Sequence, residues 1–326
     1  MWTIVSFIKA AIIQSIPLLF GSTGEIITEK SGNLNLGIPG IMYVGGISGI
    51  IGGYIYEHSV LTANPVLCVL ISFISSLLGS ALMSLIYAFL TQSLKANQNV
   101  TGLALTTFGV GVGNFFGGSL LKLFNESGSI SLLTTGSAYK AVLPFAHKTG
   151  IFGELFLSYG FLAYLAIVIS ILASIILNKT RVGLNLRAVG ESPATADAAG
   201  INVIKYKYLS ILIGGMTAGL GGLFFVMDYT AGAWTNNGFG DRGWLAIAIV
   251  IFALWKPKNA ILSSFIFGGL YIVCVYIPGL SSAAKEIIKM LPYLVTIIVL
   301  IFISTKNKRE NQPPASLGLS YFREER

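Results

Sequence analysis

The amino-acid sequence predicts an all-α protein: a polytopic membrane helical bundle of about nine transmembrane helices with an inverted-repeat core. Of its 326 residues, 54% are hydrophobic and only 10% are charged. A soluble domain has about 25% charged residues, and the mean hydropathy here is +0.78. The charges are also segregated, which leaves uncharged runs at 31–56, 59–94, 96–121, 155–178 and 259–284. Each run exceeds the roughly 20 residues that a helix needs to cross a bilayer.

Nine spans are expected along the chain, at 6–28, 38–56, 65–93, 98–122, 153–178, 207–229, 241–255, 259–278 and 286–305. Pro65 suits the first turn of the third span, because a first turn does not use the N–H that proline lacks. The spans form one transmembrane domain, residues 1–305, which includes a long connection at 179–206. A polar tail, 306–326, follows, and we expect it to be solvated.

The lysines and arginines indicate how the bundle is oriented, since they favour the cytoplasmic side of a membrane. Fourteen of the 21 fall in one alternating set of connections or in the tail, which places that side and the C-terminus in the cytoplasm. An odd number of spans then places the N-terminus outside. Orientation explains the net charge of +8, and we expect no nucleic-acid partner.

Two stretches rich in glycine and amides interrupt the spans: 24–40, predicted to face inward, and 230–244, predicted to face outward. Their opposite placement indicates an inverted repeat, and irregular backbone near spans must be satisfied by protein or water. Ordinary loops are the alternative. Glycines four residues apart mark helix faces that approach closely in lipid, either as static packing or as a mobile interface. They are Gly45, Gly49 and Gly53; Gly109, Gly113 and Gly117; Gly215 and Gly219.

Several side chains are candidates for a translocation pathway, because polar groups inside spans are costly and usually functional. They are Asn33, Asn35, Asn99, Asn114, Trp234 and Asn236. Helix capping explains Asn99 and its neighbours equally well. An interhelical hydrogen bond would explain Asn114, and a position at the membrane interface would explain Trp234.

The sequence shows no pattern for catalysis. It lacks the phosphate-binding loop G-x-x-x-x-G-K-[ST], so the chain does not hydrolyse ATP by that route. It has no nucleophile elbow and no cluster of its two histidines and two cysteines. We therefore expect no catalytic residue, no cofactor and no metal site.

The sequence of the connection 179–206 predicts a short helix. Ser192 suits its N-cap, Pro193 its first turn and Gly200 its end. An alanine-rich helix of this kind, outside the membrane, has little apolar area of its own. It therefore needs a partner surface.

Three stretches of the chain resemble the signatures of one known family. They are 24–40 (GEIITEKSGNLNLGIPG), 97–105 (NQNVTGLAL) and 187–201 (RAVGESPATADAAGI). They are similar to the branched-chain amino acid/ribose type of ABC importer permease, and closest to its nucleoside-uptake branch. Pro39 departs from the pattern, because relatives commonly have an acidic residue there.

The resemblance implies a type II ABC importer permease in a bacterial inner membrane, which moves a small-molecule substrate, a nucleoside, by alternating access. It implies a cytoplasmic ABC ATPase, a second and unlike permease subunit, and an external substrate-binding lipoprotein as partners. It also makes 187–201 the coupling helix that docks on the ATPase. The residues carried into that role are Arg187, Gly190, Glu191, Pro193, Ala198 and Gly200.

Two alternatives stay open at this point. The same kind of permease could import riboflavin or a simple sugar. A stand-alone secondary transporter is the other class, and it would need an intramembrane ion or proton site. Asp228 is the one acid that the sequence offers for it.

Overall fold

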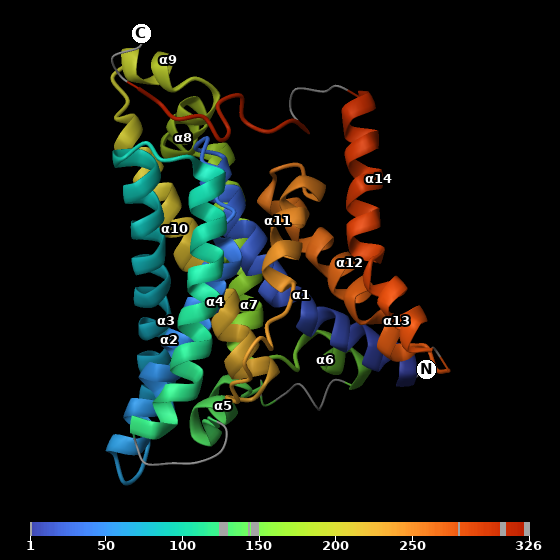
Figure 1. Cartoon of the computed structure of the whole chain (residues 1–326). Helices are drawn as coiled ribbons and strands as arrows, with labels where there is room; N and C mark the ends of the chain where they lie inside the picture. The colour runs from blue at the N-terminus through green and yellow to red at the C-terminus, as the bar shows by residue number, and fades with distance from the viewer. Residues whose placement is uncertain are drawn as a thin grey trace.

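The computed structural model describes residues 2–123, 130–142, 144, 150–279, 281–306 and 311–322. Its regular structure in this part of the chain is helical, which confirms the all-α prediction (Figure 1). The first half contains α1 (Trp2–Glu29), α2 (Ile38–Ser59), α3 (Pro65–Ala88) with a π-helical turn at Phe89–Ser93, α4 (Gln98–Leu123), α5 (Leu133–Tyr139) and α6 (Gly150–Phe156). The second half contains α7 (Phe161–Lys179), α8 (Arg181–Glu191), α9 (Pro193–Ala198), α10 (Val203–Phe224) with a π-helical turn at Phe225–Tyr229, α11 (Arg242–Phe252), α12 (Pro257–Tyr276), α13 (Ser282–Lys289) and α14 (Leu291–Lys306).

Seven helices in the described residues are long and apolar enough to cross a membrane, so the chain is a multi-pass membrane protein. They lie at Ile4–Glu29, Ile38–Ser59, Pro65–Ser93, Gln98–Leu120, Phe161–Lys179, Val203–Tyr229 and Pro257–Tyr276. The predicted spans 241–255 and 286–305 correspond to α11 and α14, which have 11 and 16 residues. At 1.5 Å per residue these measure about 16 Å and 24 Å. Both fall short of a hydrocarbon core of about 30 Å.

The centre of the bundle is formed by α1, α2 and α10. The buried share of an 18-residue apolar stretch differs among the spanning helices. It is 78% in α2 and α10 and 56% in α1, but only 28–39% in α3, α4, α7 and α12. The outer helices expose apolar side chains along one face, such as Leu70, Ile74 and Leu78 of α3. This is the pattern of helices that face lipid, since apolar side chains there lose nothing by exposure.

The regularly spaced glycines pack the central helices together. A Cβ atom on Gly45 of α2 would lie 2.6 Å from the Cα of Gly219 in α10, and one on Gly109 of α4 would lie 2.7 Å from the Cα of Gly40. These contacts allow backbones to approach closely, as small residues do between helices in lipid. The described structure therefore supports the packing interpretation at these positions.

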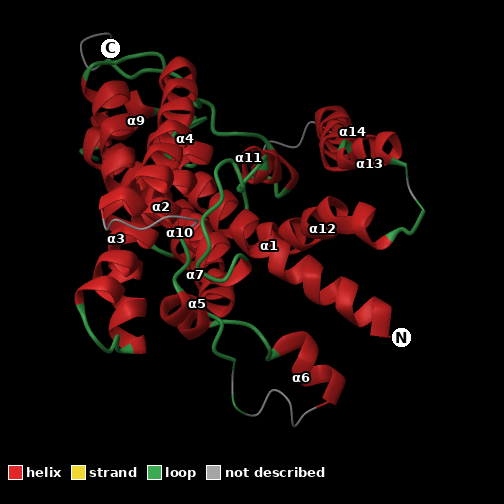
Figure 2. Ribbon diagram, turned by 60° about the horizontal axis from the view of Figure 1, so that its bottom comes forward, coloured by secondary structure: helices red, strands yellow, loops and turns green. Residues whose placement is uncertain are grey.

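The connections of the bundle gather at two ends. The end that carries α8 and α9, which we call the α8–α9 end, also holds 30–37, 94–97, 253–256 and the tail (Figure 1). The opposite end, which we call the α5–α6 end, holds α5, α6, α13 and the turn between α2 and α3. This is the grouping that the basic residues predicted. Both views place α3 and α14 on opposite flanks of the bundle (Figure 2).

Candidate functional site

Helix α8 lies against the ends of α1 and α7. Its N-terminus is capped by Thr180, whose Oγ1 accepts a hydrogen bond from the N–H of Gly183 over 3.1 Å. A side chain at Gly183 would collide with the carbonyl of Ile176 in α7, and one at Gly190 with the carbonyl of Lys30 after α1. The two glycines thus let α8 pack closely against both spans.

Helix α9 follows at once and has defined caps at both ends. The Oγ of Ser192 accepts a hydrogen bond from the N–H of Thr195, and Pro193 occupies the first turn. Gly200 ends the helix with φ +83, and the N–H of Ile201 donates to the carbonyl of Ala196 over 3.0 Å. This is a Schellman ending, which favours glycine because an L side chain is strained at positive φ. The sequence prediction of a short capped helix is confirmed.

The six residues predicted to couple the chain to an ATPase fall into two groups. Arg187, Gly190 and Glu191 belong to α8, where Gly190 is buried and has a packing role. The other three, Pro193, Ala198 and Gly200, lie on or directly after α9, and the last two are exposed. Glu191, at the end of α8, is exposed as well, so the exposed surface of this segment includes the end of α8 together with α9.

The tail packs on the α8–α9 end in residues 311–322, so the prediction of a solvated tail is wrong for this part. Ser316 is 7% exposed, and both its N–H and its Oγ donate to the carbonyl of Gly190, over 3.1 Å and 2.6 Å. Further along, the N–H of Gly318 donates to the carbonyl of Gly32, and Tyr321 donates to Asp197 over 2.8 Å. Polar composition suggested solvation, but these polar groups bind backbone and side-chain acceptors of the bundle.

Two buried acids near the end of α1 were missed by sequence reasoning. Glu25 accepts a hydrogen bond from the N–H of Asn35 over 2.9 Å, and Glu29 accepts one from the indole N–H of Trp255. Trp255 has a left-handed backbone with φ +54, which is unusual for a large side chain. The acids thus tie α1 to the α1–α2 connection and to the turn after α11. The sequence feature that could have identified these two acids is their position at the end of an apolar run, beside a segment rich in amides.

The amides of the α1–α2 connection hold its backbone in place. Asn33 and Asn35 are fully buried. Asn33 accepts a hydrogen bond from Gln92 over 3.0 Å and donates to Ser31 over 2.7 Å, and Asn35 accepts from the N–H of Gly37 over 2.9 Å. In this conformation they are covered by protein, so their observed role is structural.

Three of the pathway candidates meet at the other irregular stretch, between α10 and α11. Trp234 donates to Asn236 over 3.0 Å and packs edge-on against Tyr43 with 5.4 Å between ring centroids. Asn114 of α4 accepts from the hydroxyl of Tyr43 and donates to the side chain of Asn237 over 3.0 Å. Asn114, Trp234 and Asn236 therefore form one polar cluster. Asn99 is exposed at the first turn of α4 and does not join it.

Arg242, at the start of α11, is a buried cation that sequence reasoning did not single out. It donates to Gln14 of α1 over 3.1 Å and to the carbonyl of Phe239 over 2.9 Å. Its guanidinium carbon lies 4.6 Å from the ring centroid of Phe225 and 4.9 Å from that of Tyr271. A buried charge in a membrane protein requires such partners, so Arg242 anchors the irregular stretch to α1.

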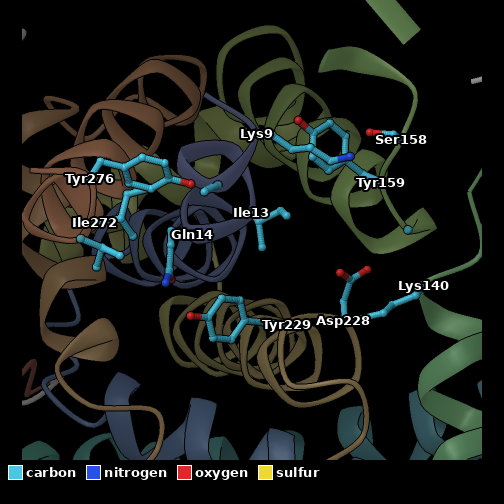
Figure 3. Close-up of a pocket in the computed structure, with 13 residues that line it drawn as sticks. Lys9, Ile13, Gln14, Lys140, Ser158, Tyr159, Asp228, Tyr229, Ile272 and Tyr276 are labelled. Atoms are coloured by element: carbon cyan, nitrogen blue, oxygen red, sulfur yellow. The ribbon is translucent and has the colours of Figure 1, made fainter. Parts of the chain in front are cut away.

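A cavity of about 570 Å³ with a mixed polar and apolar lining lies between α1, α12 and the turn after α10 (Figure 3). Asp228 and Tyr229 line it from one side and Gln14 from another, with Lys140 close by. Asp228 is 9% exposed, and its Oδ2 has no hydrogen-bond partner among the described residues. The polar cluster around Asn114 does not line this cavity.

Comparison with known proteins covers almost the whole chain. Residues 7–300 match the family described as the branched-chain amino acid transport system permease component. The nucleoside ABC transporter permease protein NupC of Lactococcus lactis is 33% identical, over 91% of this chain and 92% of its own length. Two guanosine ABC transporter permease proteins of Bacillus subtilis also match. NupQ is 29% identical over 98% of this chain and 97% of its own length, and NupP is 22% identical over 92% and 82%.

Proposed function

The chain belongs to the branched-chain amino acid transport system permease family, and we propose that it is the membrane-spanning subunit of an ATP-binding-cassette importer for nucleosides. The observation that carries this proposal is the similarity to permeases named for nucleosides and guanosine, which extends over more than 90% of this chain. Similarity of that extent covers the spans, both irregular stretches and the α8–α9 segment together. The substrate is therefore proposed from relatives whose whole membrane domain corresponds to this one.

We propose that the α8–α9 end is cytoplasmic and that the chain crosses a bacterial inner membrane nine times. The basic residues concentrated at this end support the orientation. The irregular stretch 230–241 with α11 would make one additional crossing. The other would be made by α14, which runs between the two ends, together with residues 286–290 that precede it (Figure 1). The irregular stretches 30–37 and 230–241 follow α1 and α10 at opposite ends of two antiparallel helices. This relation supports an inverted repeat, although α11 is much shorter than α2.

Helix α9 would dock on a separate cytoplasmic ABC ATPase and would couple ATP hydrolysis there to transport. Glu191, Ala198 and Gly200 are exposed on this docking surface. Arg187 and Gly190 are less exposed and lie on α8, which is held against α1 and α7. A movement of α9 caused by the ATPase would therefore be transmitted through Gly190 to the end of α1. Such a rigid connection is what coupling between an ATPase and a membrane domain requires.

A second, unlike permease subunit would pack along α4. The exposed face of this helix carries Leu103, Phe108 and Phe115, and side chains at Gly111 or Gly118 would meet no atom within 4 Å. B. subtilis has two guanosine permease proteins that match this chain at different identities, which favours a pair of unlike subunits. The pathway would then run beside α4, past Asn99 and the cluster of Asn114, Trp234 and Asn236. An external binding lipoprotein would deliver substrate at the α5–α6 end.

The substrate is tested by uptake of radiolabelled guanosine in cells that lack this gene and in cells that carry it on a plasmid. We expect uptake to require the gene and to be competed by unlabelled nucleosides. Competition by ribose, glucose or riboflavin with no effect of nucleosides would overturn the substrate assignment. Uptake that persists when the phosphate-binding lysine of the partner ATPase is replaced would indicate a secondary transporter instead.

A further inference from the structure

A second cavity, of about 470 Å³, lies at the α8–α9 end between the ends of several spans. Its walls come from the end of α1, the end of α7, α8, the α11–α12 turn and the tail. The residues that line it are Lys30, Leu177, Asn178, Arg187, Glu191, Trp255, Lys256, Pro257, Gln312 and Pro314. None of the residues in the polar cluster around Asn114 reaches it, so it is separate from the proposed pathway.

The lining carries an excess of positive charge. Lys30, Arg187 and Lys256 come from three different elements, and Glu191 is the one acid that joins them in the lining. Burial lowers the pKa of the Lys30 ammonium below its ordinary value. The carboxylate of Glu191 opposes this shift, whereas the positive charges of Arg187 and Lys256 add to it. Like charges held together in a partly buried place favour binding of an anion.

Arg187 gives a second indication, besides the excess of positive charge, that the cavity binds an anion. Its Nε is buried and has no hydrogen-bond partner among the described residues. A buried guanidinium N–H left unsatisfied costs free energy, and a phosphate oxygen is a strong acceptor for it. Lys256, in contrast, donates to Asn311 of the tail over 3.2 Å, so the tail closes one side of the cavity.

The remaining lining consists of four apolar residues, Leu177, Trp255, Pro257 and Pro314, and of the amides of Asn178 and Gln312. Leu177 and Pro257 lie at the ends of α7 and α12, which are joined by a 2.7 Å hydrogen bond from Ser170 to the carbonyl of Pro257. Below Leu177, α7 exposes Leu172 and Ile176 on its outer side. An acyl chain could lie along this apolar surface while its headgroup enters the cavity.

We propose that this cavity binds the phosphate headgroup of an anionic phospholipid of the inner leaflet, with the acyl chains along α7. Basic pockets between helices on the cytoplasmic side are suited to such headgroups. The orientation is the one proposed above, but the binding itself does not depend on what the protein transports. Because the headgroup would touch α8 and the tail, its presence would hold the segment that carries α9.

The test uses the complete purified transporter in detergent, with dioleoylphosphatidylglycerol and dioleoylphosphatidylcholine as probes. Binding is measured by native mass spectrometry and by the shift of the thermal unfolding midpoint. We expect phosphatidylglycerol to bind in preference to phosphatidylcholine, and Lys256→Gln to weaken this binding about fivefold, as for loss of one lysine near an anionic headgroup. Lys256→Arg should keep the binding, because it keeps the charge.

Two control variants separate charge at the cavity from other effects. Asn311→Ala removes the hydrogen bond to Lys256 but keeps the cation, and Lys205→Gln removes an exposed charge of the same end that does not line the cavity. Neither should weaken binding of phosphatidylglycerol. Equal binding of both lipids, or equal effects of Lys256→Gln and Lys205→Gln, would overturn the proposal. Displacement of the lipid by inorganic phosphate alone would overturn the lipid assignment and leave a phosphate-ion site.

Discussion

Ser316 donates two hydrogen bonds to one acceptor, the carbonyl oxygen of Gly190: its Oγ over 2.6 Å and its N–H over 3.1 Å. Gly190 lies in α8 and touches the end of α1, so the tail, the α8–α9 segment and a central span meet at this point. The tail is therefore part of the surface proposed to receive the ATPase.

The first prediction concerns this tail. Ser316→Ala should remove the Oγ bond, which is worth about 1 kcal/mol, and should speed amide hydrogen exchange at residues 316 and 318 about fivefold. The measurement is hydrogen exchange followed by mass spectrometry on the purified transporter. Leu319→Ala, at an exposed side chain, is the control. Exchange that is already fast in the unmodified protein would show that the tail is not docked.

The second prediction concerns the contact between α2 and α10. Gly45→Ala places a methyl group against the backbone of Gly219 and should destabilise the protein by about 1–3 kcal/mol. Gly269→Ala in α12 is the matched control, because its new methyl group would have only ordinary contacts at 3.8 Å. Thermal unfolding in detergent compares them. Equal unfolding midpoints for the two variants would contradict the close packing of α2 against α10.

The sequence predicted most of the spans well, and the reason is visible at α3. Its apolar run and its opening Pro65 predicted 65–93, and α3 with its π-helical turn occupies the same residues. The run 241–255 also looked like a span, yet α11 has only 11 residues. Hydropathy counts apolar residues and does not detect a segment that enters the bundle as irregular backbone. Residues 230–241 are such a segment.

The candidate site was less predictable, because amides serve two purposes that sequence does not separate. Asn33 and Asn114 were both interpreted as pathway residues. The structure shows Asn33 buried under Gln92, whereas Asn114 is half-buried in a cluster with Tyr43 and Asn237. Partners from distant parts of the chain decide the difference. The same holds for Glu29, whose partner Trp255 lies 226 residues away.

The third prediction concerns the polar cluster. Asn114→Leu should lower the rate of nucleoside uptake about threefold to tenfold, because it removes hydrogen bonds to Tyr43 and Asn237 in a membrane-embedded region. The amount of protein in the membrane should not change. Thr107→Ala on the same helix is the control, since among the described residues the Thr107 hydroxyl bonds only within its own helix, to the carbonyl of Leu103. Unchanged uptake in Asn114→Leu would remove this cluster from the pathway.

The fourth prediction concerns Arg242. Arg242→Lys keeps the charge but loses the planar contacts with Phe225 and Tyr271, so it should destabilise the protein by about 1–2 kcal/mol. Gln14→Ala should cost about 1 kcal/mol, since it removes one hydrogen bond. Thermal unfolding midpoints of both variants provide the measurement. A lysine variant as stable as the unmodified protein would show that the charge alone matters there.

The proposal that a separate ATPase drives this chain through α9 is tested most directly by site-specific photocrosslinking. A benzophenone amino acid is placed at Ala198 on α9 or at Leu133, which is 78% exposed at the α5–α6 end. If α9 docks on the ATPase, position 198 should crosslink to a protein with a phosphate-binding loop and position 133 should not. Failure of position 198 to form that adduct in an assembled, transport-competent complex would contradict coupling through α9.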